Sequence, residues 1–509
     1  MKGVLVRDCS IGGKGRYNVY CQDGKIVRID EGGTVPPSGA KVIDANGGSL
    51  CLGFIDSHCH PFEYGWLKRS VDLRGTTSMT AVRFRVAAGI QRAKPGEWIS
   101  GMGWDQEAFP GKTMPSRAEV DDISPENPVV LSRVCGHVAL LNSKSIEVLG
   151  YADRTGEEYE RDGNGALTGI VKERAVEEAH QKLPRSAEIS AADLQSVEAE
   201  AGRLGLTTLH CIVSRNSFRE ELGALSALDA SGSLSLGYRV YVPPEALDYV
   251  DATGIGKKQV GPCVRTNGVK IYADGSLGAR TAALREPYAD DPSKTGILRY
   301  TDEQLAELVE AVDSRGMQAI VHAIGDRAVE QAAEALGSVA GGGNPRGHRI
   351  EHASLLPKDV RSKMARHSVR ATVQPLFITS DTWAVDRLGE ERVRDLYPLK
   401  SMLIEGIVAS GSSDSPIESM SPILGMWAAM TRGDPDSREK LSLEQALRLY
   451  TVNARFNGLD SAEGLSEGAP ADLTLLDSDI SGMHPALFRK VGVLATIVGG
   501  RVVHSYGAA

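Results

Sequence analysis

Eight short apolar segments, rich in β-branched residues, recur through the middle of the chain and constrain its fold more than any other feature. They occupy residues 53–58, 205–211, 235–242, 266–274, 317–323, 348–353, 369–375 and 406–414. Parallel strands that are buried on both faces read as unbroken apolar runs of this kind. Most of these segments are separated by stretches of helical periodicity, such as residues 301–316, where Thr301 precedes Gln304 in the pattern of a capping box.

This alternation predicts an α/β fold, a (β/α)8 TIM barrel, because eight strand–helix units suffice to close a parallel sheet on itself. A doubly wound open sheet is the alternative. Glycine accounts for 56 of the 509 residues, which suits the many tight turns that such a barrel needs. The barrel is therefore the favoured fold.

Both ends of the chain look β-rich. Residues 17–30 contain two alternating runs around Asp23-Gly24, and a similar pair of runs near the C-terminus surrounds Gly499-Gly500. Such patterns are typical of β-hairpins. We therefore expect residues 1–52 and 466–509 to form one composite β-sandwich, and residues 53–465 to form the barrel domain.

One long segment interrupts the alternation after the first predicted strand. It spans about residues 63–190 and is rich in Gly, Pro, Trp and charged residues, whereas a βα loop normally has two to six residues. We expect it to be an inserted subdomain over the C-terminal mouth of the barrel, where loops shape the active site.

The composition excludes several classes of protein. A net charge of −9 gives no electrostatic footprint for nucleic acid or for an anionic membrane. The first thirty residues lack a signal-peptide pattern, and no apolar run approaches the roughly 18 residues of a membrane span. The seven cysteines include no CxxC pair, which argues against a disulfide framework. We expect a cytoplasmic protein that acts on a small molecule, with a homodimer as a compatible assembly.

The segment "GFIDSHCHP" places two histidines at the end of the first predicted barrel strand. Residues i and i+2 of a strand point to the same face, so His58 and His60 project side by side while Cys59 turns away. Two imidazoles arranged in this way can converge on one cation. The pair alone is a weak signal, because it also occurs in strands without a ligand.

Polar side chains at the ends of other predicted strands strengthen this interpretation. His322, His352 and Asp414 end three strands, and Lys270 lies near the end of the fourth. Barrel strands direct their carboxyl ends to one rim, so these side chains should meet there. The alternative is that each is a separate buried group with its own hydrogen-bond partner. Since four of the eleven histidines fall at this rim, we favour a shared site.

Imidazoles and carboxylates are the usual ligands of zinc and similar divalent metals. The histidines and Asp414 could hold one metal completely or two incompletely, and two metals would need a shared anion between them. A desolvated lysine beside cations can lose its proton and take up carbon dioxide, giving a carbamate that supplies one oxygen to each metal. Lys270 is the candidate bridge, and an ion pair of Lys270 with Asp274 is the alternative.

Such a site predicts hydrolysis. A metal lowers the pKa of bound water from 15.7 to about 7, which makes hydroxide available as the nucleophile. Asp414 is placed to accept the proton of this water and to return it to the departing amine. His137, in the insert, is a candidate to help polarise the substrate carbonyl, with an ordinary loop role as the alternative. For His210, at the end of the second strand, we favour a structural role.

Several residues near strand ends or in the insert are candidates to bind the substrate. Aromatic side chains there suit an apolar pocket, although they are as often packing. Arg280 could bind a carboxylate or organise its own loop. The candidates are Trp104, Tyr272, Arg280, Phe377 and Trp383.

Six motifs make a family resemblance explicit. They are "GFIDSHCH", "VKIYADGSLGARTAAL", "VHAIGDRA", "RIEHAS", "QPLF" and "SGSSDSPIE". Together they resemble the amidohydrolase superfamily, and within it amidohydrolase family 3, the branch of YtcJ-like and N-substituted formamide deformylase-like metal-dependent hydrolases. The resemblance runs almost end to end and implies a metal-bearing barrel with a composite β-sandwich. It implies metal ligands at His58, His60, Lys270, His322, His352 and Asp414, with Asp414 as the catalytic acid and base.

The resemblance and the presence of Lys270 favour two divalent ions, with zinc expected, bridged by carboxylated Lys270. The predicted activity is hydrolysis of a non-peptide C–N bond in an amide, an N-formyl compound or a carbamate-like compound. The alternatives are a mononuclear deaminase, which does not need the lysine, and a lactone or ester hydrolase on the same barrel. A non-catalytic scaffold is the least favoured, because every expected ligand is present.

Overall fold

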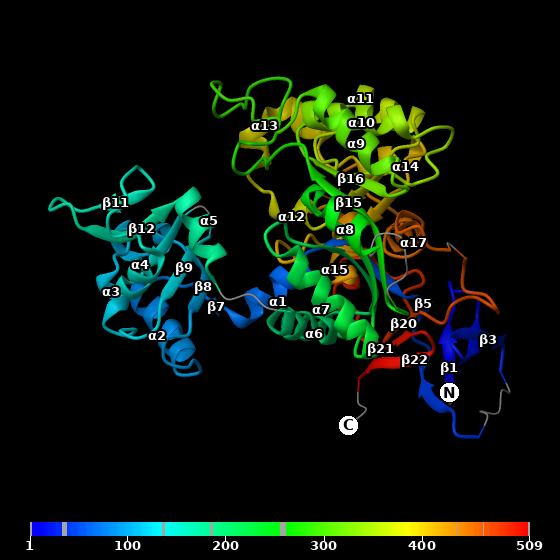
Figure 1. The fold of residues 1–509 in the computed structure, drawn as a ribbon. Helices are drawn as coiled ribbons and strands as arrows, with labels where there is room; N and C mark the ends of the chain where they lie inside the picture. The colour runs from blue at the N-terminus through cyan, green and yellow to red at the C-terminus, as the bar shows by residue number, and fades with distance from the viewer. Residues whose placement is uncertain are drawn as a thin grey trace. The chain divides into compact units, whose positions relative to one another are not determined.

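The computed structural model describes residues 3–32, 38–134, 138–183, 187–254, 261–434, 436–461 and 463–506. The chain divides into two compact units (Figure 1). One unit contains residues 1–61 and 195–509, and the other contains residues 62–194. The first unit carries the barrel and the terminal strands, and the second is the insert.

Eight parallel strands form the sheet of the first unit, in the order β19-β18-β17-β16-β15-β14-β13-β6. Their bounds are β6 Phe54–Cys59, β13 Leu206–Ile212, β14 Gly237–Val242, β15 Val264–Tyr272, β16 Gln318–Ala323, β17 Arg349–His352, β18 Arg370–Val373 and β19 Ala409–Gly411. All eight lie within or overlap the predicted segments. Every residue of β6 and β13 is buried, which explains why they read as continuous runs.

Strands β6 and β19 come together at the seam of the sheet. The Asp414 N–H donates to the His58 carbonyl at 2.9 Å, and the His60 N–H donates to the Ser415 carbonyl at 2.8 Å. These bonds link the residues that follow β19 to the carboxyl end of β6. The predicted barrel is confirmed, and the open sheet is excluded.

Helices connect the strands of this unit. Helix α9 (Asp302–Asp313) begins at the predicted capping box, in which Thr301 and Gln304 bond each other's backbone N–H. Helix α10 (Asp326–Val339) packs between α9 and α11 (Lys358–Arg366) on the outside of the barrel (Figure 1). The other elements are α6 Ala187–Arg203, which crosses the boundary between the units, α7 Phe218–Ala230, η3 Pro244–Ala246, α8 Leu247–Thr253, α12 Phe377–Ser380, α13 Ala384–Arg392, η4 Val393–Asp395, α14 Leu399–Ile404, α15 Pro422–Thr431, α16 Leu443–Leu449, α17 Val452–Asn457 and α18 Pro485–Phe488.

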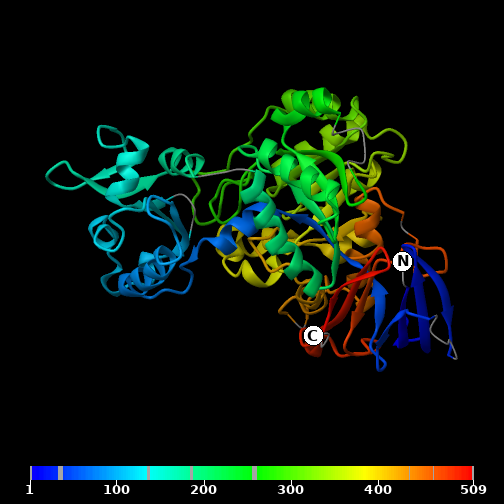
Figure 2. The same cartoon turned by 60° about the horizontal axis from the view of Figure 1, so that its bottom comes forward.

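The two ends of the chain build a pair of four-stranded sheets, and their strands lie side by side in Figure 2. One sheet has the order β3-β2-β1-β4 and the other β22-β21-β20-β5. Their inner faces share a core that includes Val6, Val19, Leu473 and Ile497. The strands are β1 Val4–Ser10, β2 Arg16–Gln22, β3 Lys25–Asp30, β4 Lys41–Asp44, β5 Leu50–Leu52, β20 Leu473–Leu476, β21 Val493–Val498 and β22 Arg501–Ser505.

Both predicted terminal hairpins form. Strands β2 and β3 pair antiparallel around Asp23 and Gly24, which have φ values of 49° and 81°. Strands β21 and β22 pair around Gly499 and Gly500, which have φ values of 54° and 72°. Glycine adopts this left-handed conformation without the steric cost that a side chain brings, and aspartate tolerates it better than most residues, so both residue pairs favour hairpin turns.

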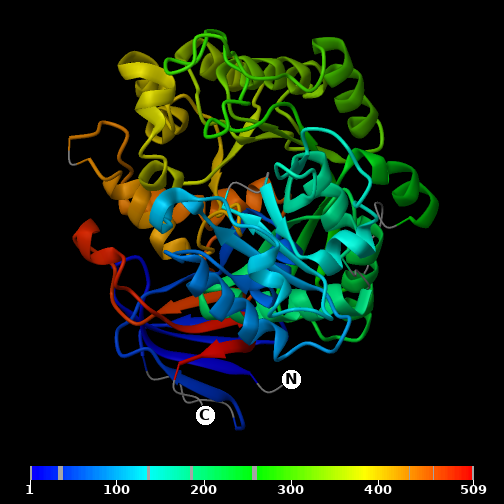
Figure 3. The same ribbon diagram turned by 90° about the vertical axis from the view of Figure 1, so that its left-hand side faces the viewer.

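The insert has its own six-stranded sheet, in the order β11-β12-β10-β9-β8-β7, seen with its helices in Figure 3. Apolar clusters cover both faces, since alternating residues of β9 and β10 belong to different clusters. The elements are α1 Pro61–Arg69, β7 Val71–Asp72, α2 Met79–Ile90, β8 Ile99–Trp104, η1 Gln106–Ala108, η2 Pro110–Lys112, α3 Ala118–Asp121, β9 Val129–Arg133, β10 Val138–Leu141, α4 Ser143–Leu149, β11 Tyr159–Arg161, β12 Leu167–Lys172 and α5 Arg174–Gln181. Among the described helices of the whole chain, none combines the length and apolarity that crossing a membrane requires.

Candidate metal centre

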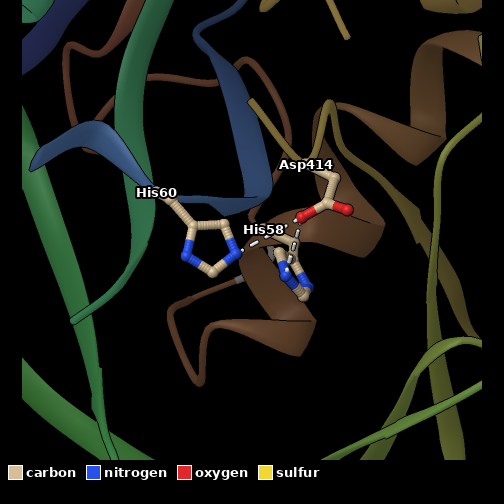
Figure 4. Close-up of side chains that lie close together, drawn as sticks. All are labelled: His58, His60 and Asp414. Atoms are coloured by element: carbon tan, nitrogen blue, oxygen red, sulfur yellow. Dashed lines mark ion pairs between the residues drawn. The ribbon is translucent and has the colours of Figure 1, made fainter. Parts of the chain in front are cut away.

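The structure brings six predicted side chains together at the carboxyl ends of the barrel strands, and we call them the rim cluster. They are His58, His60, Lys270, His322, His352 and Asp414. The Oδ1 atom of Asp414 lies 3.2 Å from His58 Nε2 and 3.4 Å from His60 Nε2 (Figure 4). Ligand atoms of these three residues all lie within 4.8 Å of one another, as a shared metal requires.

The other members extend this group. Lys270 Nζ lies 3.0 Å from His58 Nε2. The ring centre of His352 lies 5.1 Å from that of His58 and 4.5 Å from that of His322. Residues separated by hundreds of positions in sequence therefore meet at one rim, although they do not all share the tight spacing of His58, His60 and Asp414.

Three of the imidazoles have one nitrogen engaged by a neighbouring acceptor. His58 Nδ1 bonds the carboxylate of Glu351, His352 Nδ1 lies 2.8 Å from Gln374 Oε1, and His322 Nε2 lies 3.0 Å from the Gly275 carbonyl. Such bonds fix the tautomer and leave the opposite nitrogen available for a metal. The donor set therefore fits a divalent cation.

Electrostatics favour neutral imidazole at one position and positive charge at another. Burial lowers the pKa of His352 to about 3, which keeps this ring neutral near pH 7. Burial opposes protonation of His58 as well, but the carboxylates of Glu351 and Asp414 raise its pKa. The surroundings of His58 thus attract a cation.

Lys270 is fully enclosed, with 1% of its surface exposed. Burial lowers its pKa to about 8, against the attraction of Glu351 and Asp414. The free amine that carbamate formation requires is therefore accessible near neutral pH. Asp274, the alternative partner, instead accepts N–H bonds from the backbone of Ala283 and Gly325.

Two rim residues have strained backbone conformations. His352 has a φ of 72° and Asp414 a φ of 55°, and both are side-chain-bearing residues in the left-handed region. Asp56 supports the turn that carries Asp414, because its carboxylate accepts the Ser413 N–H at 3.0 Å and also bonds the Ser413 hydroxyl. Such strain persists where surrounding contacts over-determine it, and it is common at functional sites.

A cavity of about 480 Å³ lies against the rim cluster, with His322, His352 and Asp414 in its wall. Phe377 lines it and stacks parallel to His352, with ring centres 6.4 Å apart. The remaining wall is formed by aromatic, aliphatic, serine and acidic residues, and the described residues that line it include no lysine or arginine. Its other residues are Ser276, Leu277, Gly278, Ile324, Ser354, Ser380, Asp381, Trp383, Tyr397, Ile417 and Glu418.

The other predicted substrate-binding residues have different environments. Tyr272 lies beside the rim cluster, with its ring centre 5.3 Å from that of His322 and 4.6 Å from Lys270 Nζ. Arg280 forms two bonds with Asp290, of 3.0 and 2.9 Å, which supports its alternative role in organising the loop.

The prediction that Trp104 lines a substrate pocket was wrong. Its side chain is 1% exposed within the apolar core of the insert. Its indole N–H donates to the Leu131 carbonyl at 2.7 Å. Burial and a satisfied donor give this residue a packing role.

Two further histidines were considered in the sequence analysis, and the first of them, His137, lies outside the described residues. His210 is fully buried beside Tyr241, with ring centres 6.1 Å apart. A Cβ atom at Gly458 would lie only 2.6 Å from His210 Nε2, so the ring packs against this glycine. This environment agrees with the structural role expected for His210.

The sequence interpretation missed Glu351, Gln374 and Arg349, which support the rim cluster without belonging to it. Glu351 and Arg349 are two residues apart in β17, and Arg349 Nε donates to Glu351 Oε1 at 2.6 Å. The signal that could have revealed a buried pair is the spacing of the two opposite charges, which lie at i and i+2 of β17 and so point to the same face of a fully buried strand.

A parallel barrel with converging imidazoles, a lysine and a carboxylate at its rim defines the class of metal-dependent hydrolases. The family model described as "Amidohydrolase family" matches residues 41–504, and the chain belongs to this family. The resemblance found in the sequence is thereby confirmed.

Individual relatives agree with this assignment. The chain is 30% identical to YtcJ of Bacillus subtilis (strain 168), over 99% of this chain and 96% of that protein. It is 26% identical to an N-substituted formamide deformylase of Arthrobacter pascens, over 91% of this chain and 89% of that one. An uncharacterized metal-dependent hydrolase from Pyrococcus furiosus has a similar crystal structure, with a TM-score of 0.80 and 32% identity. The match covers 94% of this chain and 99% of that one.

Proposed function

We propose that this protein hydrolyses a non-peptide C–N bond of a small amide, N-formyl or carbamate-like compound. The observation that carries the proposal is the convergence of His58, His60 and Asp414 beside the buried amine of Lys270, with Asp414 in the wall of a cavity. The family assignment supports a hydrolase, and the geometry supplies the residues for one.

The rim cluster would hold two divalent ions, with zinc the favoured metal. Such ions lower the pKa of a coordinated water to about 7 and polarise a carbonyl group. Lys270 would help to hold these ions as a carbamate, formed when its neutral amine attacks carbon dioxide to make an N–C bond and one proton is released to solvent. The pKa of about 8 makes this step feasible near neutral pH.

Asp414 is the proposed proton carrier. Its Oδ1 lies near His58 and His60, and its side chain also borders the cavity. In this position its carboxylate accepts the proton of the attacking water and then donates it to the nitrogen of the scissile bond. The amine leaves neutral, and the acid product gives its remaining proton to solvent and leaves as a carboxylate.

The cavity favours a substrate with an apolar or aromatic group. Phe377, Trp383 and Tyr397 supply flat apolar surface, and a volume of about 480 Å³ suits a small molecule. An anionic substituent would meet Asp381 and Glu418 without a lysine or arginine among the described lining residues. The name of the Arthrobacter pascens relative adds support for an N-formyl amide.

Release of 4-methylbenzylamine from N-(4-methylbenzyl)formamide by zinc-loaded protein tests this proposal, with the N-acetyl analogue and 4-methylphenyl acetate as comparisons. We expect amine release that stops on chelation and returns with zinc. If the loaded protein cleaves the ester and releases no amine from either amide, the esterase alternative replaces this function. A mononuclear deaminase is less well supported, because it leaves Lys270 without a role.

A further inference from the structure

A fully buried ion pair lies next to the rim cluster, and the proposed chemistry does not use it directly. Arg349 and Glu351 both have 0% of their surface exposed. One carboxylate oxygen of Glu351 accepts a bond from Arg349 Nε at 2.6 Å, and the other bonds His58 Nδ1. The carboxylate therefore connects a fixed positive charge to one of the candidate metal ligands.

The guanidinium group of Arg349 is held on several sides. Its NH1 atom donates to the Tyr241 hydroxyl and to the Asn457 carbonyl, each at 2.9 Å, and its NH2 atom donates to the Ser57 carbonyl at 3.1 Å. A planar group with this many partners cannot rotate freely. Arg349 thus fixes the position of the carboxylate that it bonds.

The backbone of β17 lets neighbouring residues face the same site. In a regular strand, Glu351 and His352 would point to opposite faces. The φ of 72° at His352 interrupts this alternation, and both side chains reach His58: Glu351 by its bond to Nδ1, and His352 by a ring separation of 5.1 Å. Strand β17 therefore supplies one candidate metal ligand, His352, and also the residue that supports a second candidate ligand, His58.

We propose that Glu351 is the positioning residue of His58, with Arg349 as its anchor; this inference rests on the metal site proposed above. By accepting the Nδ1–H bond, Glu351 holds His58 in the tautomer whose Nε2 lone pair is free. That nitrogen lies 3.0 Å from Lys270 Nζ and 3.2 Å from Asp414 Oδ1, among the other candidate ligands. His352 is supported by the amide of Gln374, and His322 by the Gly275 carbonyl at 3.0 Å, with Asp274 Oδ1 farther away at 3.4 Å. Among these three imidazoles, His58 is the one whose nearest support is a carboxylate anchored by an arginine.

The test compares zinc affinity in wild-type protein and in Glu351→Gln, measured by competition with a chromogenic chelator at fixed pH. Loss of such a support typically weakens metal binding 10–100-fold, and we expect a loss in this range. The visible spectrum of the Co²⁺-loaded variant should also change, because it reports ligand geometry. For the N-formyl substrate, kcat should fall more than KM rises.

Glu198→Gln is the matched control, since Glu198 is another buried carboxylate in the same unit. It accepts N–H bonds from Ser235 at 2.8 Å and Leu236 at 2.9 Å, and no contact joins it to the rim cluster among the described residues. We expect unchanged zinc affinity and an unchanged Co²⁺ spectrum in this variant, even if its thermal stability falls. An equal loss of affinity in both variants would show a general structural effect and overturn the inference.

Coupling to His58 gives a second criterion. If Glu351 acts through His58, then His58→Ala and the double variant His58→Ala/Glu351→Gln should bind zinc equally weakly. If Glu351→Gln fails to fold, Arg349→Lys is the alternative variant, because lysine retains the positive charge but lacks the guanidinium fork of donors. We expect this variant to bind zinc several-fold more weakly than wild type. Wild-type zinc affinity in Arg349→Lys would contradict the inference. Wild-type protein that binds no zinc would instead overturn the proposed function itself.

Discussion

The β-sandwich and the barrel bury very different interiors, although they belong to one unit of the chain. The sandwich core is apolar and includes Val6, Val19 and Leu473. The barrel encloses Lys270, Arg349 and Glu351 at 0–1% exposure, together with the imidazole of His58. Apolar burial stabilises a fold, whereas buried charges carry a desolvation cost that their pairing only partly offsets. The difference indicates that the sandwich contributes stability, while the barrel interior is arranged for chemistry.

Positive φ values occur in both regions. In the sandwich hairpins they include Gly24 and Gly500, where glycine adopts them readily, and also Asp23. In the barrel they include His352 and Asp414, two members of the rim cluster, where side chains make them costly. Because the rim cluster lies in the barrel, perturbing each region should have separable effects on catalysis and on folding.

The largest expected effect is that of Asp414→Asn, which removes the proposed proton carrier. General acid–base catalysis contributes about 10²–10⁴-fold to rate, and kcat should fall by roughly this factor. Metal content should persist, because the other rim ligands remain. Measurement of kcat together with metal analysis checks both parts, and turnover close to that of the wild type would refute the role of Asp414.

Leu473→Ala, in the sandwich, should change stability and leave catalysis unchanged. Leu473 is 0% exposed, and truncation of a buried leucine typically lowers the free energy of unfolding by about 2–5 kcal/mol. Denaturant titration should show this loss, while kcat and KM of the folded protein stay unchanged. A fall in kcat without loss of stability would show that the sandwich takes part in catalysis.

The pH dependence of metal-free protein provides a third test. The pKa of Lys270 falls from 10.5 to about 8 on folding, so between these values the unfolded chain binds a proton that the native protein lacks. Stability from this group therefore rises with pH across this window, by at most about 3 kcal/mol. The free energy of unfolding should be measured across this pH window for wild type and for Lys270→Met. The buried thiols titrate in both proteins, so the difference between the two free energies isolates the contribution of Lys270. A difference that does not vary with pH would contradict the lowered pKa.

The smallest expected effect is in the cavity wall. Phe377→Leu removes the flat surface that stacks on His352. A change of this kind in an apolar pocket is worth about 1–3 kcal/mol, so KM for N-(4-methylbenzyl)formamide should rise roughly 10-fold. An aliphatic formamide serves as control and should show little change. Equal effects on both substrates would argue against contact between Phe377 and an aromatic group.

Much of the fold could be predicted because buried parallel strands have a recognisable sequence pattern. Fully buried strands such as β6 and β13 read as unbroken apolar runs, and paired turn residues such as Gly499-Gly500 mark hairpins. The insert was recognisable only as an interruption. Its own sheet went unpredicted because short, mixed strands such as β7 and β11 lack a strong periodic pattern.

The rim residues were predictable from their positions at strand ends, but the contacts that their supports make with them were not. Strand alternation directs Glu351 away from His352, and nothing in these residue types indicates the positive φ that brings both to His58. Trp104 shows the opposite failure. An aromatic residue at the end of a strand suits a pocket or a core equally well in sequence, and only burial distinguishes them.

Anomalous X-ray scattering at the zinc absorption edge, from crystals of zinc-loaded protein, tests the central claim most directly. We expect metal peaks at bonding distance from the His58 and His60 imidazoles, with extended density on the Lys270 amine between two ions. Fully loaded crystals whose only zinc peaks lie away from the barrel rim would contradict it.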